Sequence, residues 1–201
     1  MSEPDADAHK RMTERRNAGY ERKQARATLE KGLLLVLTGP GKGKTSSALG
    51  MAVRAIANGM RLGVVQFIKG AKASGERDLL ARFPNVAWFT IGDGFTWITQ
   101  NREQDIATAR RAWDQAKQLI TDQSYDMVIL DELNIVLHYE YLDVAEVIAT
   151  IATRQSMQHV IVTGRNAPPA LIAAADLVSD IHVVKHPYKD QGVKAQRGIE
   201  F

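Results

Sequence analysis

The chain of 201 residues is 45% hydrophobic and 24% charged, a composition typical of one globular domain with a sizeable core. It contains no cysteine, which excludes disulfides, thiolate metal sites and a cysteine nucleophile. Its apolar runs are shorter than the roughly 18 residues of a membrane span and its start is charged, so we expect a cytoplasmic protein with no membrane partner.

Positive charge is concentrated near the start of the chain. Between Lys10 and Arg26 seven basic residues oppose Glu14 and Glu21, a local charge of +5, whereas the whole chain carries +3 and the remainder therefore −2. A basic arm on a near-neutral body supports nucleic-acid binding less than a basic face would. We expect residues 1–31 to form a basic arm or helix and residues 32–201 to form the folded domain.

Apolar runs alternate with helix-like stretches along the rest of the chain, which is typical of a parallel sheet covered on both faces. In chain order the predicted strands are 33–38, 62–68, 86–91, 127–130, 159–163 and 177–184. The predicted helices are 44–58, 74–82, 101–122, 144–152 and 169–175, and the tail after Pro187 is expected to be a loop. In the longest helix, apolar residues from Ile106 to Ile120 recur at intervals of three and four, so one face should pack on the sheet.

A glycine-rich turn joins the first strand to the first helix of this domain. Gly39, Gly41 and Gly43 precede Lys44 and Thr45. Glycines allow backbone N–H groups to turn toward phosphate oxygens, and the helix N-terminus adds a positive dipole end. The lysine can then reach the phosphates while the threonine hydroxyl coordinates Mg²⁺.

This turn departs from the general pattern G-x-x-x-x-G-K-[ST] at one position, because Thr38 stands where the first glycine is expected. The alternative interpretation is an ordinary glycine turn between a strand and a helix. The remaining match favours an α/β fold of the three-layer P-loop NTPase-like (RecA-like) kind, with a mostly parallel sheet.

Two acids follow the apolar run 127–130. Asp131 and Glu132 should face the phosphate loop, because parallel strands end along one edge of a sheet. Either carboxylate could supply an oxygen ligand for Mg²⁺, and the two cannot be ranked because they point to different faces if the strand continues. The alternative is that they cap the next helix.

Three functions fit these motifs. A P-loop ATPase or kinase would transfer the γ-phosphoryl group with Glu132 polarising the nucleophile. A RecA-like single-strand binder would need stacking aromatics and a basic channel, whereas aromatic residues make up 6% of the chain. A third function follows from a resemblance to a known family.

Six ordered blocks resemble the P-loop class of ATP:corrinoid adenosyltransferases over nearly the whole of residues 32–201. These blocks are 38–45, 65–70, 94–97, 131–133, 162–165 and 192–201. In that family a threonine is usual at the position of Thr38, so the departure from the general pattern becomes a match. Asparagine is common where Pro40 stands, and proline removes one N–H donor from the loop.

The resemblance implies that Co(I) of a corrinoid attacks the 5′ carbon of ATP and expels triphosphate, in adenosylcobalamin biosynthesis or salvage. It implies that ATP is held by Thr38, Gly39, Gly41, Lys42, Gly43, Lys44, Thr45, Ser46 and Arg165. Lys44, Thr45 and Glu132 would be catalytic, and Thr45, Asp131 and Glu132 would hold Mg²⁺ or Mn²⁺. Co(I) carries no proton to remove, so Glu132 would be a metal ligand or positioning group and not a base.

The same resemblance assigns Phe95 and Trp97 to the lower face of the corrin ring. It implies a homodimer, an electron-donating reductase such as a flavoprotein, and no nucleic-acid partner. The basic arm resembles the family's terminal helix, which closes over the corrinoid, and this implies that Arg15, Arg16 and Arg22 meet corrinoid carboxylates or amides. The alternative is that these arginines form a solvated helix face. His182 and His186 are interpreted as surface or loop residues, because His182 falls in a predicted strand and His186 precedes Pro187, so the two are not expected on one helical face. The cobalt-binding pattern D-x-H-x-x-G is not matched here, because Lys185 stands where its glycine should be.

Overall fold

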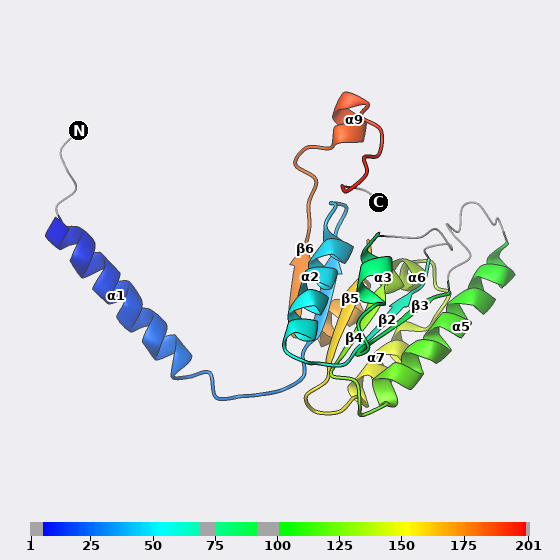
Figure 1. Ribbon diagram of the computed structural model, residues 1–201, viewed down its shortest axis with the longest axis horizontal. Coiled ribbons are helices and arrows are strands. Elements are labelled where there is room, and N and C mark those ends of the chain that lie inside the picture. Colours follow the sequence, from blue (N-terminus) through cyan, green and yellow to red (C-terminus); the bar gives the residue numbers. More distant parts are fainter. Residues whose placement is uncertain (1–5, 69–74, 92–100, 200–201) are drawn as a thin grey trace. The chain divides into compact units, whose positions relative to one another are not determined.

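The computed structural model describes residues 6–68, 75–91 and 101–199. The chain divides into two units, Met1–Lys31 and Gly32–Phe201. The described part of the first unit is dominated by helix α1 (Ala6–Gln24), whose side chains are mostly exposed (Figure 1). No helix of the described residues is long and apolar enough to cross a membrane.

The second unit is built on a six-stranded sheet. Its strands are β1 (Leu34–Thr38), β2 (Leu62–Gln66), β3 (Val86–Thr90), β4 (Met127–Asp131), β5 (His159–Thr163) and β6 (Leu177–Asp180). They lie in the order β3-β2-β4-β5-β1-β6, and every neighbouring pair is parallel. The described helices of this unit are α2 (Lys44–Ala57), α3 (Gly75–Leu80), α5 (Arg102–Thr121), α6 (Leu133–His138), α7 (Val144–Ala152), α8 (Pro169–Ala174) and α9 (Pro187–Gln191).

Alternation along the strands separates two cores. Leu35, Leu37 and their equivalents on other strands pack against α2 and α3, whereas Val36 and its equivalents pack against α5, α6, α7 and α8. The four central strands, β2, β4, β5 and β1, are buried on both faces, as expected for a sheet with helices on each side, whereas the edge strands β3 and β6 are more exposed. The predicted three-layer α/β fold is therefore confirmed, and the sheet is parallel throughout the described strands.

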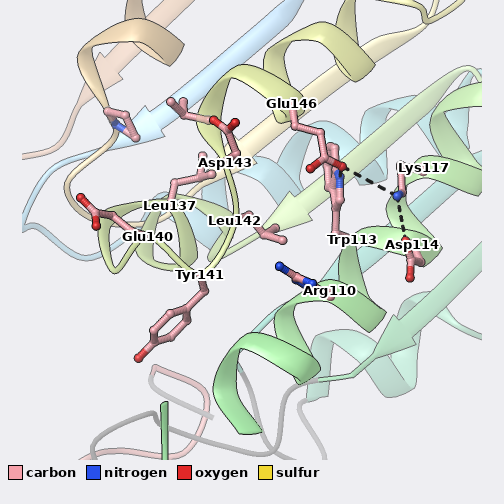
Figure 2. A pocket seen from close by; sticks show the side chains of 12 residues that line it. Arg110, Trp113, Asp114, Lys117, Leu137, Glu140, Tyr141, Leu142, Asp143 and Glu146 are labelled. Atoms are coloured by element: carbon pink, nitrogen blue, oxygen red, sulfur yellow. Dashed lines mark hydrogen bonds and ion pairs between the residues drawn. The ribbon is translucent and has the colours of Figure 1, made fainter. Parts of the chain in front are cut away.

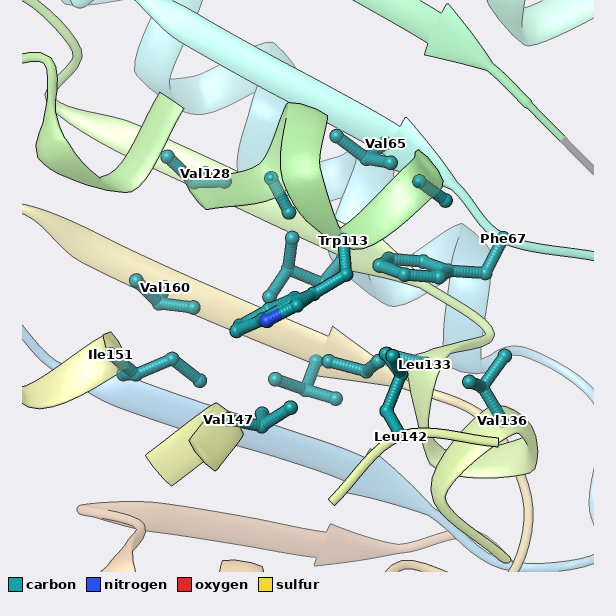
Figure 3. Close-up of a cluster of buried hydrophobic side chains, with 14 of the residues drawn as sticks. Val65, Phe67, Trp113, Val128, Leu133, Val136, Leu142, Val147, Ile151 and Val160 are labelled. Carbon is teal, nitrogen blue, oxygen red and sulfur yellow. The ribbon is translucent and has the colours of Figure 1, made fainter. Parts of the chain in front are cut away.

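Trp113 is the largest buried side chain of the α5 core. Its ring lies between α5, the sheet and α7, close to Phe67 and Leu133 (Figure 3). Its indole Nε1 donates to Glu146 Oε1 at 3.1 Å, which satisfies the polar atom of the ring. The predicted apolar face of this helix is confirmed. Asn101 begins the helix, and its side chain accepts a hydrogen bond from the Gln104 amide.

Three expectations about elements were wrong. Helix α6 was not predicted, because its apolar residues continue directly from the strand before it and show no separate period. The last strand ends at Asp180 and not at 184, since the backbone beyond it turns onto the phosphate loop. The tail predicted as a loop contains the short helix α9, which His186 begins by accepting hydrogen bonds at Nδ1 from Tyr188 and Lys189 amides.

The carboxyl edge of the sheet carries a row of polar side chains. Each strand ends in a polar residue: Thr38, Gln66, Thr90, Asp131, Thr163 and Asp180. Since all six strands are parallel, these residues lie at the same edge, where the phosphate loop also begins. In open α/β sheets this edge is where ligands bind.

Candidate functional site

The phosphate loop connects the end of β1 to the start of α2. Gly39 has φ 98° and Gly43 has φ 111°, both in the left-handed region that residues with a Cβ avoid. Gly41 is needed for another reason, because a Cβ there would lie 2.7 Å from the carbonyl oxygen of Ile181. Its N–H donates to that same oxygen at 2.6 Å, so this amide faces the segment after β6. The sequence had predicted that the amides of this loop face its interior.

Lys44 begins α2 and is 7% exposed. Its Nζ donates to the carbonyl oxygens of Gly39 at 2.9 Å and Gly41 at 2.6 Å, so the ammonium group lies inside the loop. Burial lowers the pKa of Lys44, partly offset by the carboxylate of Glu132, while Arg165 lowers it further. Three other residues predicted to bind ATP, Lys42, Ser46 and Arg165, are exposed.

Asp131 is the centre of a hydrogen-bond network behind the loop. The carboxylate is 1% exposed. Its Oδ1 accepts hydrogen bonds from Thr45 Oγ1 at 2.8 Å and Thr163 Oγ1 at 2.7 Å, and its Oδ2 accepts from Gln66 Nε2 at 3.0 Å. These three donors offset the cost of burying the charge. The predicted approach of Asp131 to the phosphate loop is therefore observed as a direct contact with Thr45.

Glu132 lies beside Asp131 in an unusual conformation. Its φ of 65° is left-handed, which costs a residue other than glycine about 1 kcal/mol or more. Its N–H donates to Thr163 Oγ1 at 3.0 Å. The residue occupies the N-cap position of α6, but its side chain makes no capping hydrogen bond there, so the capping alternative is wrong for this acid.

The absence of a side chain at Gly164 leaves room for the Glu132 carboxylate. It has φ 125°, and a Cβ there would lie 3.2 Å from Glu132 Oε2 and 3.0 Å from the Asn134 side chain. The turn after β5 can therefore approach this carboxylate only because residue 164 has no side chain.

Asn134 belongs to the same region and was missed by the sequence analysis. It is fully buried, and its Nδ2 donates to the carbonyl oxygen of Gly164 at 2.9 Å and that of Leu37 at 3.5 Å. The amide thus connects α6 to the ends of β5 and β1. A polar residue inside the otherwise apolar run 133–137 was the signal that could have identified it.

Oxygen atoms dominate the donor set of this site. Thr45 supplies a hydroxyl, and Asp131 and Glu132 supply carboxylates, the ligand types that Mg²⁺ and Mn²⁺ prefer. Within the described residues, no group of three or more His, Cys, Asp or Glu side chains could hold a metal ion. A cation here would need phosphate oxygens as further ligands, which is how Mg²⁺ binds in nucleotide sites.

The two aromatic residues predicted to contact the corrin ring, Phe95 and Trp97, lie outside the described residues. Thr38 is described and nearly buried, and its Oγ1 accepts a hydrogen bond from the Ala167 amide at 3.1 Å. It therefore ties the start of the loop to the segment after Arg165, and Arg165 itself is near enough to influence Lys44 electrostatically.

A cavity of about 900 Å³ lies on the opposite face of the sheet, between α5, α6 and α7 (Figure 2). Three of its charged side chains contact one another. Lys117 Nζ lies 2.8 Å from Asp114 and 3.8 Å from Glu146, and Glu146 also accepts from Trp113. The lining residues of this cavity include none of the phosphate loop, and Thr45 belongs to α2, which packs on the other face of the sheet.

Comparisons with known proteins agree with the geometry. Residues 30–201 match the family model described as ATP:corrinoid adenosyltransferase BtuR/CobO/CobP. The corrinoid adenosyltransferase of Pseudomonas aeruginosa is 51% identical over 194 residues, which are 96% of this chain and 95% of that protein. That of Sinorhizobium is 49% identical, covering 100% of this chain and 94% of the relative. That of Escherichia coli K12 is 47% identical, covering 88% and 89%.

Among solved structures, the flagellar accessory protein FlaH of Methanocaldococcus jannaschii superposes with a TM-score of 0.52 at 11% identity. The superposition covers 79% of this chain and 74% of FlaH, and at this identity it supports the fold alone. The family match covers the whole of the second unit and includes the phosphate loop, Asp131 and Arg165. The chain belongs to the ATP:corrinoid adenosyltransferase family.

Proposed function

We propose that this protein transfers the 5′-deoxyadenosyl group of ATP to the Co(I) of a corrinoid and releases triphosphate. The observation that carries the proposal is the family match over residues 30–201 together with about 50% identity to corrinoid adenosyltransferases over nearly their whole length. The ATPase or kinase alternative and the single-strand-binding alternative have no comparable support.

The phosphate loop would hold the triphosphate of ATP. Lys44 is already directed into the loop, and the N-terminus of the 14-residue helix α2 points at the same place. Lys42, Ser46 and Arg165 are exposed around it and would contact outer phosphate oxygens. Thr38, Gly39, Gly41 and Gly43 would contribute the shape of the loop.

Mg²⁺ or Mn²⁺ fits the oxygen ligands of Thr45, Asp131 and Glu132. When bound, such a cation would neutralise part of the charge of the triphosphate. Thr45 Oγ1 donates a hydrogen bond to Asp131 Oδ1, so lone pairs of the hydroxyl oxygen remain for a further partner. Asp131 would act from behind this hydroxyl, and Glu132 from beside the loop.

The residues of the loop would act on the leaving group. The nucleophile is Co(I), which forms a bond to the 5′ carbon while the bond from that carbon to the triphosphate oxygen breaks, and the electron pair leaves with triphosphate. Lys44 and the α2 N-terminus would stabilise the negative charge that gathers on this oxygen. No proton is transferred in this step, so Glu132 would not act as a general base.

Several further properties are proposed from the resemblance alone. Phe95 and Trp97 would shield the lower face of the corrin ring, and the basic arm would close over the corrinoid. We expect a cytoplasmic homodimer that receives its electron from a separate reductase such as a flavoprotein.

The products of one reaction test the proposal. The protein is incubated with ATP, Mg²⁺ and chemically reduced corrinoid, and the light-sensitive alkylcobalt spectrum is followed together with the phosphate products. We expect an alkylcobalt product and inorganic triphosphate in equal amounts. If ADP and orthophosphate appear without alkylcobalt, the chain is an ATPase or kinase. Salt-dependent binding of single-stranded DNA would favour the single-strand-binding alternative.

A further inference from the structure

A second layer of hydrogen bonds lies behind Asp131. Gln66, the last residue of β2, is 3% exposed, and its side chain reaches the neighbouring strand β4. Its Nε2 donates to Asp131 Oδ2 at 3.0 Å. This is the oxygen of Asp131 that does not accept from Thr45 or Thr163.

The orientation of the Gln66 amide is fixed by the strand on its other side. Trp88 Nε1 donates to Gln66 Oε1 at 3.2 Å, and Thr90 Oγ1 donates to the same oxygen at 3.1 Å. An indole N–H is a donor only, so it requires the amide oxygen on its side. The NH₂ group must then face Asp131. Strand β3 therefore determines which group Gln66 presents to the carboxylate.

This arrangement holds both oxygens of Asp131. With Oδ2 bonded to Gln66, rotation of the carboxylate would break at least one buried hydrogen bond. A carboxylate held in this way keeps Oδ1 directed at Thr45. The Thr45 proton stays on the Asp131 side, and the lone pairs of the hydroxyl stay available to the loop.

We propose that Gln66 is a positioning residue which, through Asp131 and Thr45, sets how strongly a divalent cation promotes ATP binding. The inference rests on the proposed ATP and metal site at the phosphate loop. Gln66 acts on the site only through Asp131, and Trp88 and Thr90 act only through Gln66. The chain of contacts therefore runs across β3, β2 and β4 to α2.

The test is calorimetric binding of ATP to the full chain, with and without Mg²⁺. The measured quantity is the ratio of the two affinities. Gln66→Leu should bind metal-free ATP as the parent does, but its ratio should fall about tenfold, the size expected for one lost hydrogen bond to a charged group. Thr90→Val keeps the bond from Gln66 to Asp131 but removes one of the two hydrogen bonds that Gln66 Oε1 accepts. The ratio of this variant should therefore fall less, about threefold.

Gln158→Leu is the matched control. Gln158 is also a buried amide and donates to the carbonyl oxygens of Leu119 and Tyr125, but it precedes β5 at the opposite edge of the sheet. The Gln158→Leu variant should lower the melting temperature as much as Gln66→Leu does. Its ratio of ATP affinities with and without Mg²⁺ should equal that of the parent. A role of Gln66 in folding alone would lower stability without changing this ratio.

The following outcomes would contradict the proposed role of Gln66. A folded Gln66→Leu protein with the parent ratio would do so, as would an equal fall in Gln158→Leu. If Gln66→Leu does not fold, Thr90→Val decides, and an unchanged ratio there is the negative result. A parent protein that binds ATP equally well with and without Mg²⁺ would remove the proposed metal site itself, and with it this role of Gln66.

Discussion

Lys44 meets two opposing demands at its ammonium group. The group must stay charged to attract a triphosphate, yet it is nearly buried and bonded to two loop carbonyls. Burial is the largest cause that lowers the pKa of Lys44, with Arg165 and Lys42 acting in the same direction. The charged form of this lysine is therefore less favourable than that of a lysine in water.

ATP binding should weaken as the pH rises from neutrality toward the ordinary lysine value of 10.5, and the loss should begin at a lower pH than for an unperturbed lysine. The reason is that the lowered pKa removes the charge earlier. Lys44→Arg should bind more weakly at neutral pH but lose little on raising the pH, because a guanidinium stays charged. Titration with a fluorescent ATP analogue over this range measures both curves.

The same lowered pKa has a consequence for the protein without ATP. Between the pKa of Lys44 in the folded chain and that in the unfolded chain, the unfolded chain binds more protons. The contribution of Lys44 to the free energy of unfolding therefore rises with pH in this window.

The binding measurement also has a negative outcome. If the ATP affinity of the parent protein stays constant up to pH 10.5, Lys44 does not bind the triphosphate.

The left-handed backbone of Glu132 is strained, and other interactions of the folded chain must offset the cost of this strain. Glu132→Gly should raise the free energy of unfolding by about 1 kcal/mol, because glycine adopts a φ of 65° without strain. Adenosyl transfer should fall about 10-fold to 100-fold, because the site loses a carboxylate. Denaturant unfolding and the alkylcobalt assay measure the two effects.

Glu140 provides the control for this substitution. It has φ 57° and is exposed in the turn after α6, away from the phosphate loop. Glu140→Gly should give a similar gain in stability with unchanged turnover. Equal losses of activity in the two variants would mean that the Glu132 carboxylate has no special role.

At the scale of elements, the phosphate loop depends on the segment that follows β6. Gly41→Ala should lower ATP affinity about tenfold or more and lower the melting temperature, because the new Cβ would lie 2.7 Å from a backbone carbonyl oxygen and the loop would have to move. Gly50→Ala is the matched change inside α2, where the position is open and exposed. It should raise the free energy of unfolding by about 0.5–1 kcal/mol and leave ATP binding unchanged. Calorimetry and thermal unfolding of the two variants decide, and equal ATP affinity would exclude a role for this close approach.

The elements that the sequence predicted well are those with their own clear period or boundary. The apolar face of α5 and the end of α2, predicted at residue 58 and observed at Ala57, are examples. Helix α6 has no boundary of this kind. The alternation of Ile181 and Val183 looks like a continuing strand, but these residues lie beyond the last pairing with β1, where Thr38 pairs with Asp180.

The residues of the candidate site divide in the same way: those that belong to local motifs were predicted, and those that depend on contacts between strands were not. Lys44, Thr45 and Asp131 were predicted because each belongs to a local motif, and the contact between Thr45 and Asp131 follows from the parallel sheet. Gln66 and Asn134 were not assigned a role. Their contacts depend on which strands are neighbours, and β2 lies beside β4 although 60 residues separate Gln66 from Met127 along the chain. Local sequence patterns do not contain this information.

At the scale of the whole molecule, positive charge is concentrated in one segment of the first unit. The local +5 between Lys10 and Arg26 stands against −2 for the rest of the chain. Arg15 and Arg22 are exposed and seven residues apart in α1, so they lie on the same face of this helix. In the proposed function this face would meet the carboxylate or amide groups of the corrinoid, whereas ATP would be held by the second unit.

Removing the charges of Arg15 and Arg22 should therefore weaken the binding of corrinoid and leave the binding of ATP unchanged. The double variant Arg15→Gln/Arg22→Gln should raise the KM for corrinoid about threefold to tenfold and leave ATP affinity unchanged, because each exposed ion pair contributes up to about 1 kcal/mol. The KM of the parent should rise with ionic strength, and that of the variant should respond less, since salt screens exposed charges. Arg54→Gln/Arg82→Gln, two exposed arginines of the second unit, removes the same net charge and should change neither value. If both double variants raise the KM equally, the effect belongs to overall charge, and the arm does not contact the corrinoid.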